Sequence, residues 1–131
     1  MNSDEAAIRE LLERWARAAH EGDLEAVLAH HAQDIVMFDV PPPEEGVRGL
    51  PAYQQTWPGF FRWQRRATFD LLSLEVVAGE DVGFAYGLLR CGTPEELAAI
   101  PERRLRLTVG LRKVEGQWTV LHEHHSFTAR D

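Results

Sequence analysis

The fold is decided by residues 103–128, which read RRLRLTVGLRKVEGQWTVLHEHHSFT. Apolar and polar residues alternate on both sides of Glu115 and Gly116, which is the period-two pattern of strands with one buried face. The Glu115-Gly116 pair predicts a tight turn. We therefore expect a hairpin of two antiparallel strands, Arg103 to Val114 and Gln117 to Thr128.

Two further strands precede this hairpin. Residues alternate from Ala67 to Val77 and again from Val82 to Cys91, with a turn between these segments. The connection from Gly92 to Pro101 has room for one helical turn, at Glu95 to Ala99. The second half of the chain is therefore expected to form an antiparallel sheet.

The first half of the chain predicts helices. Apolar residues recur at helical spacing after Ser3, the expected N-cap, and the pattern stops at Gly22. Helices followed by a sheet indicate an α+β fold, and residues 1–131 are expected to form one domain. The other expected elements are a helix from Leu24 to His31 capped by Asp23, a strand from Ile35 to Val40 ended by prolines, and a helix from Gly49 to about Arg62 that Pro58 should kink or end.

The composition excludes several classes of protein. The chain has 131 residues, 44% apolar and 27% charged, which is ordinary for a globular domain. A net charge of −7 argues against a nucleic-acid partner, because phosphate binding needs a basic face. The single cysteine suits a reducing cytoplasm. No apolar run approaches the roughly 18 residues of a membrane helix, and no signal peptide is evident, so we expect a cytoplasmic protein without a membrane partner.

Four features in chain order carry a family resemblance. They are Trp15 followed by Gly22-Asp23-Leu24-Glu25, the strand Asp34 to Asp39 before prolines, Gly49 opening a helix, and Arg112 to Trp118 followed by His122 to Ser126. Together they resemble the nuclear transport factor 2-like superfamily, in its SnoaL-like and ketosteroid isomerase-like branches. The last block is also similar to the association domain of calcium/calmodulin-dependent kinases. The resemblance implies a cone of three N-terminal helices on a strongly curved antiparallel sheet, a small-molecule pocket and a homodimer.

The same resemblance implies a catalytic role for Asp39. In ketosteroid isomerases the aspartate at this place is the proton-shuttling base, and partial desolvation beside Phe38 would raise its pKa toward a useful range. The alternative is an aspartate that only caps the loop. The isomerase's oxyanion donors are missing, since their positions fall at Trp15 and at or near Gly110. Steroid isomerisation is therefore not expected.

The closing strand carries the cluster His122-Glu123-His124-His125. Strict alternation places His122 and His124 on one face, together with Trp118, Val120 and Ser126, and places Glu123 and His125 on the other. The family resemblance implies that the second face points toward the pocket, although a bulge in the strand would reverse this orientation. Glu123 and His125 then join Asp39 as candidates for acid–base catalysis.

His122 and His124 also suggest a metal site. Two imidazoles on one strand face are a common metal-binding geometry, but zinc or iron needs a third ligand, which no local spacing supplies. The alternative places both rings on the outer sheet face, in a dimer interface. We expect no cofactor.

The remaining candidates are for substrate binding. Tyr86 and Arg90 share a strand face that the resemblance turns inward, where Arg90 would hold an anion by a bidentate contact. Arg90 could instead form an internal ion pair or lie exposed. Trp15, Tyr53 and Trp57 belong either to the wall of an apolar pocket or to the core.

Three functions therefore remain open. The first is a SnoaL-like enzyme that performs cofactor-free proton transfer on a small, mostly apolar substrate, as in isomerisation, cyclisation, dehydration or hydrolysis. The second is a non-catalytic binding or dimerisation module. The third is a metal-dependent enzyme that uses His122 and His124.

Overall fold

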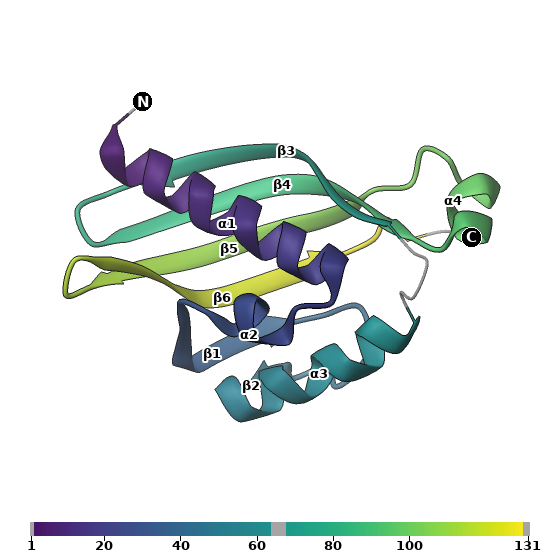
Figure 1. The fold of residues 1–131 in the computed structure, drawn as a ribbon, viewed down its shortest axis with the longest axis horizontal. Coiled ribbons are helices and arrows are strands. Elements are labelled where there is room, and N and C mark those ends of the chain that lie inside the picture. Colours follow the sequence, from purple (N-terminus) through teal and green to yellow (C-terminus); the bar gives the residue numbers. More distant parts are fainter. Residues whose placement is uncertain (1, 64–67, 130–131) are drawn as a thin grey trace.

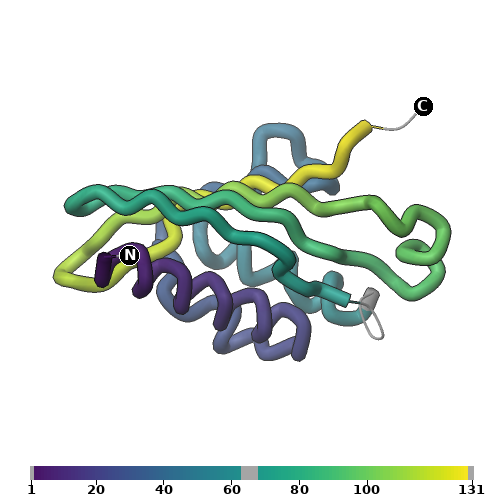
Figure 2. Tube along the Cα trace, turned by 90° about the horizontal axis from the view of Figure 1, so that it is seen from above, coloured from purple at the N-terminus to yellow at the C-terminus, as the bar shows by residue number. Residues whose placement is uncertain are grey.

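The sheet is built around two adjacent hairpins, and helices cover one of its faces (Figures 1 and 2). The computed structural model describes residues 2–63 and 68–129. The expected strand start at Ala67 and the side chain of Trp63 lie outside this description. The elements in chain order are α1 (Ser3–Glu21), α2 (Leu24–Leu28), β1 (His31–Phe38), β2 (Val47–Arg48), α3 (Leu50–Trp63), β3 (Thr68–Ala78), β4 (Val82–Gly92), α4 (Pro94–Ala99), β5 (Leu105–Val114) and β6 (Gln117–Ser126).

The described strands form one mixed sheet, in the order β2-β1-β6-β5-β4-β3. Strands β3 to β6 pair antiparallel as expected, whereas β1 lies parallel to β6. The expectation of a purely antiparallel sheet was therefore wrong. The reason is that β1 and β6 lie at opposite ends of the chain, so no hairpin turn imposes an antiparallel pairing on them.

The turn between β5 and β6 confirms the sequence prediction. Glu115 has φ 51° and Gly116 has φ 80°. Two successive residues with positive φ match the right-handed twist of the flanking strands, as in a type I′ hairpin.

The helix boundaries confirm that Gly22 ends the first helix and that Asp23 caps the second, but the expected N-cap at Ser3 was wrong. Gly22 ends α1 in the left-handed region, and the Asp23 carboxylate accepts the Ala26 N–H at the start of α2. Asn2 is the N-cap of α1, because its side chain accepts the Glu5 N–H. Helix α2 ends at Leu28, before the expected His31, which instead begins β1.

Helix α3 continues through Pro58 to Trp63, so this proline does not end the helix. Proline removes one backbone hydrogen bond, which usually destabilises a helix interior. Aromatic packing offsets that loss, because Trp57 contacts both Phe60 and Phe61 in the last turns. Helix α4 begins with a capping box formed by Thr93 and Glu96.

The core lies between the helices and the inward sheet face. Ile8 and Leu12 of α1 are buried against this face, together with Leu89 of β4 and Val109 of β5. Each such side chain stabilises the fold by about 1.5–3 kcal/mol relative to an exposed one. No helix in the described parts of the chain is long and apolar enough to cross a membrane.

A bulge in β6 sets the direction of its side chains. Gly110 pairs with His122 while the next residue, Leu111, pairs with Val120, so Leu121 is an extra residue. Val120 and Glu123 consequently both point into the core, as does Trp118. Strict alternation had placed Trp118 and Val120 with His122, and the bulge corrects that assignment.

Candidate functional site

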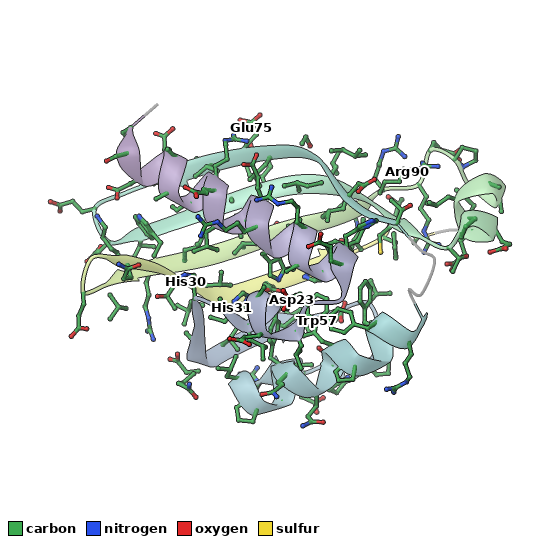
Figure 3. All side chains as sticks on the ribbon, in the orientation of Figure 1. Asp23, His30, His31, Trp57, Glu75 and Arg90 are labelled. Atoms are coloured by element: carbon green, nitrogen blue, oxygen red, sulfur yellow. The ribbon has the colours of Figure 1, made fainter. Side chains whose placement is uncertain are left out.

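An apolar pocket of about 560 Å³ opens between α3, the end of β1 and the ends of the central strands. Most of its wall is hydrophobic, and Asp39 and His125 supply two of its ionisable groups. Trp57 projects from α3 toward the sheet and forms part of the wall (Figure 3). Other apolar residues of the wall are Met37, Phe60, Phe69, Leu105 and Phe127.

Asp39 and His125 meet at this pocket. Asp39 Oδ1 lies 3.6 Å from His125 Nδ1, slightly longer than a direct N–H···O hydrogen bond. The same oxygen accepts the N–H of Val40 at 2.8 Å. The Asp39 side chain is 27% exposed and that of His125 is 8% exposed, so the imidazole lies deeper.

Glu123 lies behind His125, on the side away from Asp39. Its Oε1 is 3.1 Å from His125 Nε2, and its side chain is only 1% exposed. Burial alone would raise the pKa of Glu123. Hydrogen bonds from His125 and His31, and the attraction of both rings, outweigh burial and lower that pKa from 4.5 to about 2.

The same contacts act in the opposite direction on His125. Burial disfavours the imidazolium, but the hydrogen bond and charge of Glu123 stabilise it, with a further contribution from the charge of Asp39. The net effect raises the pKa of His125 above its usual 6.5. The imidazolium form therefore persists to higher pH than in a free histidine.

Three further groups hold Glu123 in place. Its Oε2 lies 2.9 Å from His31 Nε2 and accepts the Tyr53 hydroxyl at 2.8 Å. His31 Nδ1 lies 2.8 Å from the Ala29 carbonyl, so both ring nitrogens of His31 face oxygen atoms. Trp15 donates its indole N–H to the Tyr53 oxygen at 3.3 Å. Burial and the neighbouring Glu123 raise the pKa of Tyr53 well above 10, so its hydroxyl remains a donor.

The aromatic candidates occupy different places. Trp15 and Tyr53 are buried beneath the pocket, in the network around Glu123, whereas Trp57 lines the pocket. Among the described residues, the buried Trp57 N–H has no acceptor with hydrogen-bond geometry. It is nevertheless close enough to Tyr53 to oppose the rise in the pKa of that phenol. We therefore do not propose that the Trp57 N–H binds a ligand.

Tyr86 and Arg90 do not lie where the sequence interpretation placed them. Tyr86 is 51% exposed on the outer sheet face, because Ala85 and Leu89 are the inward residues of β4. Arg90 donates to the Pro101 carbonyl at 2.7 Å and lies beside α4, well away from Trp57 (Figure 3). Arg90 also does not line the pocket. The described ion pairs of Glu123 and Asp39 are with His31 and His125, not with Arg90.

The two other histidines of the cluster belong to the outer face. Phe38 contacts both rings edge-on, with centroids 5.1 Å from His122 and 5.7 Å from His124. His122 Nδ1 lies 2.6 Å from the Val36 carbonyl, so that nitrogen serves as a donor. Within residues 2–63 and 68–129, no group of three ligands for a metal ion comes together. A metal centre at His122 and His124 therefore lacks its third ligand in the described chain.

Sequence reasoning missed two residues of this site. His31 was expected at the end of a helix, and only the parallel pairing of β1 with β6 brings it to Glu123. Arg103 was named only as the first residue of a predicted strand, yet its side chain lines the pocket. Arg103 lies two residues before Leu105, so the alternation of the strand predicted from Arg103 to Val114 already gives Arg103 the face of Leu105, and this signal could have identified it.

Solved structures share this fold. An NTF2-like (nuclear transport factor 2-like) protein of unknown function from Pseudomonas putida KT2440 is 35% identical with a TM-score of 0.84, over 95% of this chain and 86% of that one. An NTF2-like protein with a cystatin-like fold from Novosphingobium aromaticivorans is 16% identical, with a TM-score of 0.76 over 98% and 84% of the two chains. A ketosteroid isomerase-like protein from Erwinia carotovora atroseptica is 18% identical, with a TM-score of 0.69 over 99% and 100%. At such low sequence identity, the last two structural similarities establish the fold only.

The sequence comparison places the chain in a family. No curated protein matches it. The profile of the SnoaL-like domain family matches residues 8–130, which is nearly the whole chain. The chain therefore belongs to the SnoaL-like domain family and has the nuclear transport factor 2-like fold.

Proposed function

We propose that this protein is an enzyme that transfers protons, without a cofactor, on a small and mostly apolar substrate. One observation carries the proposal. His125 lies between the buried Glu123 and the pocket-lining Asp39, at 3.1 Å and 3.6 Å. Two ionisable groups with different environments thus meet at the edge of an apolar cavity, which is the arrangement acid–base catalysis requires.

The environments assign the two roles. Asp39 is the more exposed group and acts as the base, whereas His125 has a raised pKa and acts as the acid. In an isomerisation, Asp39 takes a proton from the carbon beside a carbonyl while His125 protonates the carbonyl oxygen, giving an enol. In a dehydration, His125 protonates the departing hydroxyl, which leaves as water while the C=C bond forms.

The Asp39 carboxyl then returns its proton to a different carbon of the enol while His125 takes back the hydroxyl proton, which completes the isomerisation and restores both groups. The dehydration, in which Asp39 takes the proton from carbon, ends instead with Asp39 protonated and His125 neutral. The proton then returns from the Asp39 carboxyl to His125 Nδ1, across a gap that is 3.6 Å wide in the resting site. This return restores both groups without a cofactor. Glu123 keeps the ring in place during the cycle, because it accepts from His125 Nε2 while His31 and Tyr53 fix the carboxylate.

The rest of the isomerase pattern is absent from the pocket. The Trp15 N–H is used on Tyr53, and Gly110 lies on the outer face beside His122. Neither position offers a donor to a developing oxyanion. Protonation by His125 takes the place of such donors in the proposed mechanism, so a steroid dienolate is a poor candidate intermediate.

Solvent deuterium exchange tests the proposal without knowledge of the product. The protein is mixed in D₂O with small carbonyl compounds such as 4-phenyl-2-butanone, and NMR follows exchange at the carbon beside the carbonyl. Asp39→Asn should slow the protein-catalysed exchange by about 10²–10⁴-fold, the usual contribution of a general base. The matched control is Glu44→Gln, which alters an exposed acid in the loop after the prolines. Exchange at the wild-type rate in Asp39→Asn would refute the assignment of the base.

A non-catalytic binding module is the second candidate. The 3.6 Å gap and the bond from the Val40 N–H to Asp39 favour it, because both suit a carboxylate that serves mainly to shape the loop. Saturable binding of the carbonyl probe without any exchange above the protein-free rate would select this function.

We also propose that a second copy of the chain covers the outer sheet face. Phe84, Tyr86 and Leu88 form an exposed apolar row along β4, which an isolated domain would leave in water. Glu75 flanks the row on β3 and Arg106 flanks it on β5. A two-fold axis parallel to β4 would bring the acidic side of one copy over the basic side of the other. Sedimentation should give the dimer mass at micromolar concentration, and Tyr86→Glu should give a folded monomer. A monomeric wild-type protein would contradict this arrangement.

A further inference from the structure

Arg103 is the arginine that lines the pocket in the described chain. Its guanidinium carbon lies 3.7 Å from the centroid of the Phe127 ring, so the cation rests on an aromatic face. Its Nε atom is buried and has no hydrogen-bond partner among the residues that the structure describes. Arg90 and Arg104 differ from it, because both donate to the Pro101 carbonyl.

The carboxylates that share the pocket with Arg103 are engaged elsewhere. Glu96 Oε1 accepts the Thr93 N–H at 2.9 Å in the capping box of α4. Asp39 accepts the Val40 N–H and faces His125. No ion pair to Arg103 is found within residues 2–63 and 68–129, so this partly buried charge has no counterion in the described part of the chain.

We infer that Arg103 binds a carboxylate of the substrate, an inference that deepens the proposed function and rests on it for the reaction. The contact with the Phe127 ring restricts the position of the guanidinium group. A fixed planar fork suits a carboxylate, which it can bind through two parallel N–H···O bonds. The two cationic groups Arg103 and His125 share the pocket with the two carboxylates Asp39 and Glu96, and this balance matches a monoanion better than a doubly charged phosphate.

The fold also sets where this carboxylate lies relative to the acid–base pair. Phe127 follows His125 by two residues, and both line the pocket. Two residues of extended chain span roughly 7 Å. The substrate is therefore an apolar molecule with a carboxylate at the Arg103 end and its reacting carbon at the Asp39 and His125 end. The cavity of about 560 Å³ is large enough to hold such a small apolar carboxylate.

Binding of a matched pair of probes tests the inference. The probes are 3-phenylpropanoate and 3-phenylpropanamide, which have nearly the same shape and differ in charge, and calorimetry gives both dissociation constants. The wild-type protein should bind the carboxylate at least ~10-fold more tightly, as expected for hydrogen bonds to charged groups. Arg103→Gln should reduce this preference to about 1, and Arg104→Gln, the matched control, should keep it.

A further variant distinguishes a true effect on binding from loss of the folded structure. Arg103→Lys retains the charge but not the planar fork, so it should keep only part of the preference, and thermal unfolding checks both variants. A preference unchanged in Arg103→Gln or Arg103→Lys would refute the role of Arg103. Equal binding of both probes by the wild-type protein, or binding of neither at millimolar concentration, would also refute it.

The proposed function can fail independently of this inference. Asp39→Asn should lose deuterium exchange yet keep or increase the preference for the carboxylate, because it removes a negative charge from the pocket. Wild-type exchange in Asp39→Asn together with a lost preference in Arg103→Gln would reject the base and retain the anion site.

Discussion

Glu123 and His125 are hydrogen-bonded at 3.1 Å although only one residue separates them on β6. Their side chains lie on the same inward face, so the buried carboxylate supports the ring that reaches the pocket. His31 and Tyr53 support the carboxylate in turn, from β1 and α3. Elements that are far apart in the sequence thereby converge on one ionised group.

Glu123→Gln should be strongly destabilising. The amide has nearly the shape of the carboxylate but removes its charge, which leaves the His31 and His125 rings without a buried counterion. Breaking a buried ion pair in this way costs about 3–5 kcal/mol. Urea unfolding at pH 7 measures the change in free energy of unfolding. Glu96→Gln alters a surface carboxylate of a helix cap and should cost less, so equal losses in both variants would contradict the central place of Glu123.

Acid should weaken the fold through the same carboxylate. The pKa of Glu123 is about 2 in the folded chain and 4.5 in the unfolded chain, so its stabilisation is present above pH 4.5 and is lost as the pH falls toward 2. The shift corresponds to about 3 kcal/mol. Urea unfolding between pH 6 and pH 2 should show this loss, and Glu123→Gln should have a flatter profile. Parallel profiles for the two proteins would count against the lowered pKa.

Proton transfer should have an alkaline limit set by His125. The raised pKa of His125 means that the imidazolium persists above pH 6.5 and is lost as the pH rises through the folded-state value. Any stabilisation from this charged ring follows the same direction. The rate of deuterium exchange should therefore decrease at alkaline pH. His125→Gln should remove most of the activity, and the activity that remains should not show this decrease. An NMR titration with a His125 pKa below 6.5 would disprove the assignment.

Tyr53→Phe should act on stability first and on catalysis second. It removes the donor to Glu123 and leaves the Trp15 N–H without its acceptor, at a cost of about 1–3 kcal/mol. Because Tyr53 does not line the pocket, the binding of 3-phenylpropanoate should change little. Tyr86→Phe is the matched control, since it removes a hydroxyl from the outer sheet face and none from the network around Glu123, and it should lower the free energy of unfolding less than Tyr53→Phe does.

Local sequence patterns predicted much of the fold. The turn at Glu115 and Gly116, the end of α1 at Gly22 and the cap at Asp23 were all predicted from residue type, because each depends on the backbone freedom or hydrogen bonding of one or two residues. The bulge at Leu121 was not predicted. It depends on the pairing of β6 with β5, which local alternation does not contain.

The residues of the candidate site were likewise predicted only in part. The sequence indicated that Asp39, Glu123 and His125 face one side, and the structure brings them into one chain of contacts. Tyr86 and Arg90 were misplaced by an incorrect phase of β4, because alternation defines two faces without saying which one is covered by helices.

The sequence by itself determined the order of helices and strands, the tight turns and the family, because these follow from side-chain periodicity, backbone preference and similarity along the chain. Only the tertiary structure decided the parallel pairing of β1 with β6, and with it the contact of His31 with Glu123. Only the tertiary structure placed Arg103 in the pocket rather than Arg90. The physical reason is that burial and charge at these positions come from residues far away in the sequence, which meet only when the sheet and helices pack together.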